Sequence, residues 1–262
     1  MPVVIGTSGW QYAPWRRRFY PEGLRAADWL PYYAERFATV ELNNAFYRLP
    51  EAASFAAWAA KTPADFVLSV KASRYLTHVK RLRDPAEPVH RLMERARAAG
   101  KKLGPVLLQL PENFKVDLGA LEAVLAQFPK HTPVAFEPRH ESWYTEATVE
   151  VLHRAGAALC LHDWHGRKVG RDWRSTHWGY VRLHGGAAAP PPSYGRRALT
   201  TWAERLAELY PAEAEVFVYF NNDSLGCALR DARRFAVAVA RVGLEPTRVP
   251  SARDVRACGV EG

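Results

Sequence analysis

Three ionisable side chains follow directly after a short apolar run near the middle of the chain. The stretch FEPRHESW, residues 136–143, places Glu137, Arg139 and His140 immediately after the apolar segment TPVAF. A carboxylate can act as a general base or a metal ligand, an arginine binds anions, and a histidine transfers protons near neutral pH. A purely structural ion-pair network is the alternative. The pattern predicts a site at the end of this run and leaves its reaction open.

Most other apolar runs also end in polar or aromatic residues, whereas their beginnings show nothing comparable. The residues in question are Trp10, Tyr12, Glu41, Asn43, Tyr47, Lys71, His78, Gln109, Trp143, Asp163, Arg182, His184, Tyr219, Asn221 and Asn222. Polar groups that lie together away from water are costly unless they pair or meet a ligand. We therefore expect these side chains to form one site, provided that the runs end on the same side of the molecule.

The elements that would position these residues are short β-rich runs that alternate with helical periodicity. Eight runs read as strands: 3–8, 39–43, 65–71, 104–110, 132–137, 157–163, 179–184 and 215–221. Seven intervening segments have apolar residues every three to four positions and read as helices: 28–37, 51–61, 88–100, 117–128, 145–156, 199–210 and 227–242.

Two segments depart from this pattern. Residues 164–178 are too polar and glycine-containing for an amphipathic helix, so we expect a long loop in the sixth strand–helix unit. Residues 243–262 have little periodicity, and we expect a loosely ordered tail after a domain of residues 1–242.

Strand–helix alternation favours a parallel sheet, and eight strands are the number that a closed barrel requires. An open doubly wound sheet usually has a glycine fingerprint after its first strand, and GTSGW is not G-x-G-x-x-G. We therefore predict a single-domain α/β fold, a TIM-like (β/α)8 barrel with a degenerate sixth unit. All strands of such a barrel end on one face, where the polar residues would meet.

Composition limits the environment of the protein. No apolar run approaches the roughly 18–20 residues that span a bilayer, and the start of the chain lacks the pattern of a signal peptide. The three cysteines are widely spaced and form no C-x-x-C pair, which is typical of a reduced compartment. These features predict a cytoplasmic protein that does not contact a membrane.

The net charge of +9 lies in four segments that are expected to surround the open end of the barrel. The charges within residues 11–23, 72–85, 163–178 and 185–198 account for the whole excess. Tryptophans 164, 173 and 178 lie among the basic residues of the third segment. Basic residues bind phosphates and aromatic faces stack on bases, so the pattern predicts a small anionic or phosphorylated ligand and is compatible with nucleic acid.

Seven stretches resemble the YecE-like proteins, the family of the domain of unknown function 72 (DUF72). They are GTSGWQYAPWRRRFYP (6–21), VELNNAFYRLP (40–50), FVLSVKASRYLTH (66–78), LGPVLLQLPENF (103–114), AFEPRHESW (135–143), YVRLHG (180–185) and VYFNNDSLGCA (218–228). The resemblance extends from about residue 4 to residue 242. It implies a TIM-barrel-like fold and brings no established activity.

The chemistry of the residues favours a hydrolase- or lyase-type enzyme on a phosphorylated or nucleic-acid-derived substrate. Lys71, Arg139 and Arg182 would bind the anion and stabilise developing charge. Glu41 or Glu137 would act as base. His78, His140 or His184 would carry protons, and Asp163 lies at the end of the next run. The remaining polar and aromatic residues named above would contact the substrate.

Two alternatives remain open. The first is a non-catalytic module that binds a nucleic-acid end or a small anion. The second is a metal-dependent enzyme, similar to a sugar isomerase or endonuclease, with Glu137, Asp163 and His184 as ligands. The sequence requires no cofactor, is compatible with a divalent metal, and does not indicate an oligomeric state.

Overall fold

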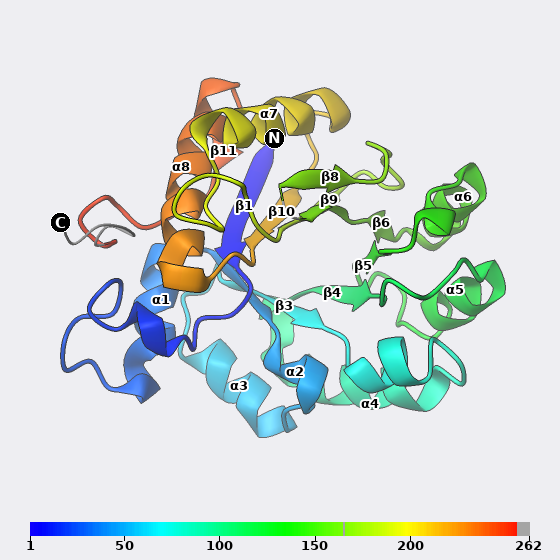
Figure 1. Cartoon of the computed structure of the whole chain (residues 1–262). Coiled ribbons are helices and arrows are strands. Elements are labelled where there is room, and N and C mark those ends of the chain that lie inside the picture. Colours follow the sequence, from blue (N-terminus) through cyan, green and yellow to red (C-terminus); the bar gives the residue numbers. More distant parts are fainter. Residues whose placement is uncertain (165, 256–262) are drawn as a thin grey trace.

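The strands form a closed barrel in the computed structural model, which describes residues 1–164 and 166–255 (Figure 1). The parallel strands are β1 (Pro2–Thr7), β2 (Thr39–Leu42), β3 (Val67–Lys71), β4 (Leu103–Gln109), β5 (Val134–Glu137), β6 (Ala158–Leu159), β7 (Leu161–Trp164), β9 (Gly179–Leu183) and β10 (Val216–Phe220). Each strand from β1 to β5 pairs with the next along the chain, and β1 also pairs with β10. The predicted barrel is confirmed.

The sixth predicted strand is divided into β6 and β7 at Cys160. β6 pairs with β5, whereas β7 pairs with β9, so this single residue joins the two halves of the barrel wall. The Cys160 amide still donates to the carbonyl of Phe136 on β5, at 2.8 Å. The break turns the second half of the strand toward β9, which positions His162 and Asp163.

The helices lie around the outside of the barrel (Figure 1). They are α1 (Trp29–Arg36), α2 (Asn44–Tyr47), α3 (Ala52–Ala60), α4 (Ala86–Ala96), α5 (Leu118–Leu125), α6 (Glu146–Ala155), α7 (Arg196–Leu209) and α8 (Cys227–Arg241). Short 3-10 or π turns span Ala13–Trp15, Ala26–Asp28, Tyr75–Val79, Arg97–Lys102, Glu141–Trp143 and Ser224–Gly226. All except α2 and the short turns correspond to predicted helices.

Local signals explain where some of these helices begin and end. The Asp117 side chain accepts a hydrogen bond from the Ala120 amide at the start of α5, and Thr145 does the same for Thr148 at the start of α6. Gly156 ends α6 in the left-handed conformation, with φ of 66°.

The described part of residues 164–178 contains no helix, as predicted, but it does contain a short strand. β8 (Arg167–Val169) pairs antiparallel with β7 and makes a hairpin that extends from the barrel wall. The Lys168 ammonium on β8 binds the Asp172 carboxylate at 2.7 Å.

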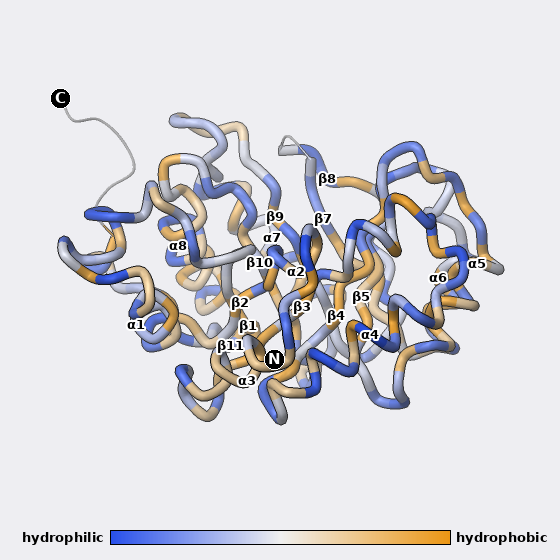
Figure 2. The backbone as a smooth tube through the Cα atoms, turned by 90° about the horizontal axis from the view of Figure 1, so that it is seen from below, coloured by the Kyte–Doolittle hydropathy of each residue, from blue (hydrophilic) through white to orange (hydrophobic). Residues whose placement is uncertain are grey.

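Alternation along the strands divides their side chains between two cores. Along β1, Val4 points into the barrel, where it packs with residues such as Leu107 and Tyr180, whereas Val3 and Ile5 pack against the helices. Figure 2 shows the hydrophobic strands surrounded by more hydrophilic outer segments.

Part of the predicted tail contacts the barrel. The strand β11 (Glu245–Pro246) pairs parallel with β1, and Arg248 donates to the carbonyl of Ala34 and binds Asp65. Asp254 binds Arg36 at 2.9 Å. Residues 256–262 of that tail lie outside the described residues. Among the described residues, no helix has the length and apolar character of a membrane span.

Candidate active site at the carboxyl end of the barrel

Two buried carboxylates share one buried arginine at the carboxyl end of the barrel. The Arg182 guanidinium on β9 donates through Nη1 to Oε2 of Glu137 on β5 at 2.7 Å, and through Nη2 to Oε1 of Glu41 on β2 at 2.8 Å. All three side chains are almost completely buried. The Tyr180 hydroxyl donates to the other oxygen of Glu41 at 2.7 Å. Burial acts to lower the pKa of Arg182, but the two carboxylates hold it well above its ordinary value.

Glu137 is the most heavily hydrogen-bonded of these groups. Its Oε1 accepts from Gln109 Nε2 at 3.2 Å, Arg139 Nε at 3.1 Å and His184 Nε2 at 3.2 Å. Burial acts to raise the pKa of Glu137, but the charge of Arg182 and the hydrogen bond from His184 keep it well below its usual value. Glu137 is therefore an ionised anchor at neutral pH and not a proton donor.

His184 is held in one orientation by groups on three strands. Asn221 Nδ2 donates to His184 Nδ1 at 3.0 Å, which leaves Nε2–H to donate to Glu137. Its backbone amide donates to Asp163 Oδ1 at 2.8 Å. Burial lowers the pKa of His184 to about 4, against the opposing effect of Glu137, so the ring is neutral at pH 7.

Asp163, which the sequence suggested as a metal ligand, does not join this network. Its Oδ2 accepts from the Tyr194 hydroxyl at 2.5 Å, and its Oδ1 binds the amide of His184. Adjacent residues of a strand point to opposite faces, so His162, not Asp163, lies beside Arg182 inside the barrel. Burial raises the pKa of Asp163 to about 6. This carboxylate positions the loop after β9.

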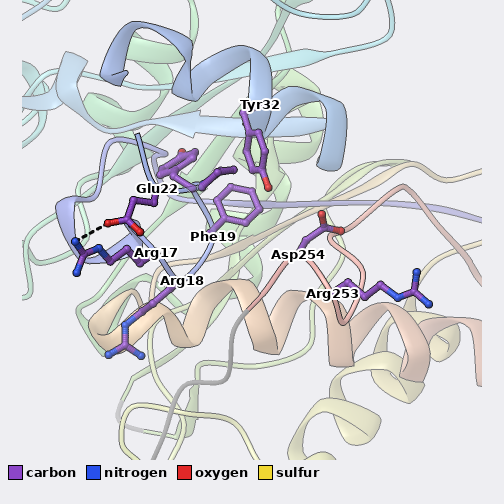
Figure 3. Close-up of a pocket in the computed structure, with 9 residues that line it drawn as sticks. Arg17, Arg18, Phe19, Glu22, Tyr32, Arg253 and Asp254 are labelled. Carbon is purple, nitrogen blue, oxygen red and sulfur yellow. Dashed lines mark hydrogen bonds and ion pairs between the residues drawn. The ribbon is translucent and has the colours of Figure 1, made fainter. Parts of the chain in front are cut away.

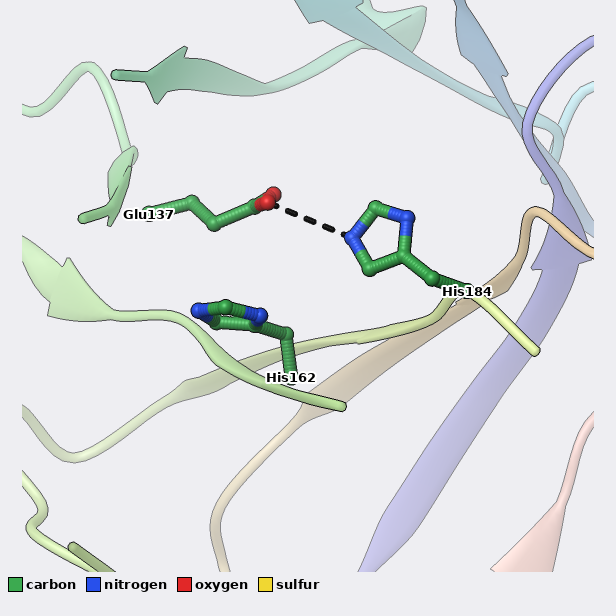
Figure 4. A group of neighbouring side chains, drawn as sticks. All are labelled: Glu137, His162 and His184. Atoms are coloured by element: carbon green, nitrogen blue, oxygen red, sulfur yellow. Dashed lines mark hydrogen bonds and ion pairs between the residues drawn. The ribbon is translucent and has the colours of Figure 1, made fainter. Parts of the chain in front are cut away.

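His162 completes a group that could hold a metal ion. Glu137, His162 and His184 each offer a ligand atom, and these atoms lie within 4.8 Å of one another (Figure 4). His162 Nε2 lies 3.0 Å from the carbonyl of Pro138, to which it donates, so Nδ1 carries the lone pair. His162 Nδ1 is buried and has no hydrogen-bond partner among the described residues.

The donor types in this group suit zinc, manganese or iron, but the charge around them does not favour a further cation. The carboxylate of Glu137 already accepts from Arg182 and Arg139, and both guanidinium groups would repel a divalent ion.

A group of positive charges lies beside the buried network. Lys71 Nζ lies 4.0 Å from the centre of the Phe46 ring, and the His78 ring packs edge-on against the same phenylalanine. Burial and then Arg182 lower the pKa of Lys71 to about 8, against the opposing effects of Glu137 and Glu41.

The same positive charges act on His78. Burial is the first cause that lowers its pKa to about 4, followed by the charges of Lys71, Arg74, Arg139 and Arg81. Within residues 1–164 and 166–255, Lys71, Arg74 and Arg81 have no acidic partner within 4.0 Å. The cluster formed by Lys71, Arg74, Arg81 and Arg139, here called the cationic cluster, therefore has unbalanced charge.

Arg139 links the cationic cluster to the β7–β8 hairpin. Its guanidinium carbon lies 4.6 Å from the centre of the Trp164 ring while Nε donates to Glu137. A planar guanidinium that rests on an aromatic face keeps its orientation and can still donate to an anion.

Several predicted site residues support the fold around the site and do not line it. His140 Nδ1 binds Ser142 and starts the short turn after β5. Trp143 is buried and donates to the carbonyl of Phe114. Asn222 donates to Asp231, and Tyr219 binds Thr39 in the barrel interior.

Most aromatic and amide residues near the first two strands make their contacts around the loop after β1. Tyr12 lies near the buried network: burial and then the charges of Asp223 and Glu41 raise its pKa, and Arg182 opposes them. Trp10 is buried edge-on against Trp58, and both Tyr12 and Asn43 donate to the carbonyl of Ser8. Tyr47 is 82% exposed.

The predicted site residues did not include His162 or Tyr180, and the sequence indicated Trp164 only as one of the aromatic residues among the basic side chains of residues 163–178. The alternation of side chains along a strand predicts Tyr180 as a neighbour of Arg182, because it lies two residues before Arg182 and therefore on the same face. His162 could not be found in this way, since the break at Cys160 decides which side of the sixth strand faces inward.

Comparison with known proteins agrees with the fold described above. The family model described as "Protein of unknown function DUF72" matches residues 4–253. The chain belongs to the DUF72 family. A DUF72 family protein from Thermotoga maritima has a similar crystal structure, with a TM-score of 0.80 and 30% identity, covering 92% of this chain and 100% of the other.

Two further proteins are similar to this chain. A DUF72 family protein from Enterococcus faecalis, 19% identical, shares the fold with a TM-score of 0.77, covering 95% of this chain and 98% of the other. The UPF0759 protein YunF of Bacillus subtilis is 25% identical over 86% of this chain and 90% of its own length. None of these names states an activity.

Proposed function

We propose that this DUF72 protein is an enzyme of the hydrolase or lyase type that acts on a phosphorylated or otherwise anionic small substrate at the carboxyl end of the barrel. The observation that carries the proposal is the unbalanced charge of the cationic cluster, which lies next to a buried network of fixed orientation. Phosphate oxygens accept charge-assisted hydrogen bonds from lysine and arginine, and such bonds stabilise charge that develops during reaction.

Lys71 is the group that we expect to exchange a proton with the substrate. A pKa of about 8 leaves both its protonation states populated near neutral pH, which suits a general acid or base. Glu137 stays ionised and holds Arg139, Arg182 and His184 in place. Arg139 would bind the anionic group, oriented by Trp164.

The test is a screen of phosphate monoesters and diesters with the wild type and Lys71→Met, together with calorimetry of inorganic phosphate binding. We expect turnover by the wild type and a loss of kcat of roughly a hundredfold or more in Lys71→Met, the size of a lost general acid or base. Lys101→Met is the matched control, because Lys101 is exposed and precedes the amino end of β4, at the opposite end of the strand from the site. Equal rates for the two variants would refute the role of Lys71.

Phosphate binding also has a spectroscopic readout. An anion beside the cationic cluster would offset the charges that lower the pKa of His78, so that pKa should rise when phosphate is added to the wild type. Phosphate binding with this shift, but without turnover of any phosphoester, would favour a non-catalytic anion-binding module.

A second candidate, a metal-dependent enzyme, is favoured by one observation, the unpartnered lone pair of His162 Nδ1 beside Glu137 and His184. Titration calorimetry with zinc and manganese, on the wild type and on His162→Gln, tests it. Stoichiometric binding that disappears in the variant would support a metal centre. Weak binding that is equal in both proteins would exclude this group as the metal site.

A further inference from the structure

A basic groove lies on the outside of the barrel, between α7 and α8. Its volume is about 270 Å³, and four of its eight lining residues are arginines: Arg196, Arg233, Arg234 and Arg241. None of the lining residues is acidic, and none belongs to the candidate active site. The helices that form the groove are adjacent in Figure 1.

The charges in this groove are not balanced. Among the residues described by the structure, none of the four arginines has an acidic partner within 4.0 Å. The carboxylate of Asp231 on α8 is buried and already accepts from the Tyr194 amide and from Asn222. Burial and then the charge of Arg230 lower the pKa of Arg234, and Arg196 and Arg233 add to this effect while Asp231 opposes it. The guanidinium groups therefore repel one another.

Another arginine-containing pocket of this protein differs in this respect. Arg17, Arg18 and Arg253 line that pocket together with Glu22 and Asp254, so it contains acids as well as bases (Figure 3). Arg17 binds Glu22 at 2.7 Å. The α7–α8 groove is therefore better suited to bind an external anion than the pocket in Figure 3, because acidic residues line that pocket and none line the groove.

The spacing of the arginines indicates an extended anion. Arg234 and Arg241 are seven residues apart, or two turns of α8, so they lie on the same side of the helix and about 10 Å apart along it. Val237, between them, is 47% exposed, and Thr200 adds a hydroxyl from α7. Successive phosphates on a linear backbone match a row of guanidinium groups, and an apolar side chain between them can contact a sugar or base.

We propose that the α7–α8 groove binds the phosphate backbone of a single-stranded nucleic acid, at a site separate from the active site. Two of the unbalanced arginines lie about 10 Å apart along α8, and two more line the same groove. This spread favours a polymer over a single phosphate, because one phosphate would contact only part of the groove. The proposal does not depend on the chemistry at the carboxyl end of the barrel, because the two sites share no residue.

Fluorescence anisotropy with a labelled single-stranded DNA of about 20 nucleotides, between about 50 and 200 mM salt, tests this proposal. The wild type should bind with an affinity that falls steeply with salt. In the double variant Arg234→Gln/Arg241→Gln we expect an affinity at least tenfold lower at the low salt concentration. The slope of log affinity against log salt should decrease by about 1.4, the value for two lost phosphate contacts on a single strand.

The matched control is Arg17→Gln/Arg18→Gln, which removes the same charge from the pocket in Figure 3 and should bind DNA within about threefold of the wild type. Lys71→Met should also retain binding, which separates the groove from the active site. Equal affinities in the groove and control variants would overturn the proposal. Binding of inorganic tripolyphosphate but not DNA by the wild type would overturn it as well. Melting temperatures of the groove variant should equal or exceed that of the wild type, because repulsion is relieved.

Discussion

At the scale of single residues, Arg182 decides the charge state of the site. One guanidinium group is hydrogen-bonded to two buried carboxylates, and all three side chains are almost completely buried. A buried ion pair gains little net stability when formed, but removal of one partner leaves an uncompensated buried charge. The function of Arg182 therefore cannot be separated from the stability of the barrel.

We expect Arg182→Met to lower the free energy of unfolding by about 3–5 kcal/mol, because Glu41 and Glu137 would remain buried without their partner. Urea unfolding followed by circular dichroism measures this loss. Addition of Glu41→Gln to the same protein should recover part of it, since one buried charge is then removed. A double variant that is less stable than Arg182→Met would contradict this account.

At the scale of elements, the β7–β8 hairpin and the turn after β5 hold each other in place. The Tyr144 hydroxyl donates to the carbonyl of Pro138 and lies 3.1 Å from His162 Nε2. Gly170, just after β8, adopts φ of +71° and lies directly against the Tyr144 ring. A side chain at position 170 would displace Tyr144 and, through it, His162.

We expect Gly170→Ala to destabilise the protein more than Gly156→Ala. Both glycines have a positive φ, but a Cβ at position 170 would lie 2.0 Å from Tyr144 Cε1, whereas position 156 has no heavy atom within 4 Å. Backbone strain alone costs roughly 1–2 kcal/mol, and overpacking adds roughly 1–3 kcal/mol at position 170. Thermal unfolding of the two variants measures the difference. Equal melting temperatures would show that the hairpin moves freely away from Tyr144.

At the scale of the whole molecule, buried titratable groups make stability depend on pH in two opposing ways. His184 and His78 have pKa values lowered to about 4, and that of His162 is also lowered. These histidines bind protons more readily when unfolded, so their contribution is present above about pH 6.5 and is lost as the pH falls toward 4. Asp163 and Asp223 have pKa values raised to about 6 and 7. They bind protons more readily when folded, so their effect on stability has the opposite sign.

The free energy of unfolding should therefore fall between pH 6.5 and 4 less steeply than three histidines alone would require. His184→Gln should make this dependence shallower, and Asp163→Asn should make it steeper. Each change amounts to at most about 1.4 kcal/mol per pH unit, the value for one proton. Chemical unfolding at several pH values measures these slopes. A change of the same sign in both variants would refute the assignment.

The net charge of +9, counted along the sequence, does not show where the basic side chains lie on the surface of the folded protein. The sequence placed the excess in four segments around the open end of the barrel. In the folded protein Arg17 and Arg18 line the pocket of Figure 3, and Arg196 lines the α7–α8 groove. Helix α8 lies outside those four segments, yet it contains four arginines and only one aspartate, and its arginines gather on one side. Segment totals do not record which face of a helix a charge occupies.

The eight main strand runs and seven of the helices of this protein follow from the sequence alone, whereas α2, β8, β11 and the division of the sixth strand do not. Hydrophobic runs of strand length and helices with a 3.6-residue period are local properties, and the parallel barrel follows from their alternation. The same alternation placed Glu41, Glu137 and Arg182 at the carboxyl ends of their strands, and all three lie together there.

Only the tertiary structure decided how those residues pair and which neighbours join them. The break at Cys160 turns His162 inward and Asp163 toward Tyr194, and no local pattern specifies that break. The hydrogen bonds of Arg182 join residues 45 and 141 positions apart in the chain. A charge therefore acquires its partner, its pKa and its possible role only when distant strands meet, because electrostatic interaction depends on distance in space and on burial, and not on order along the chain.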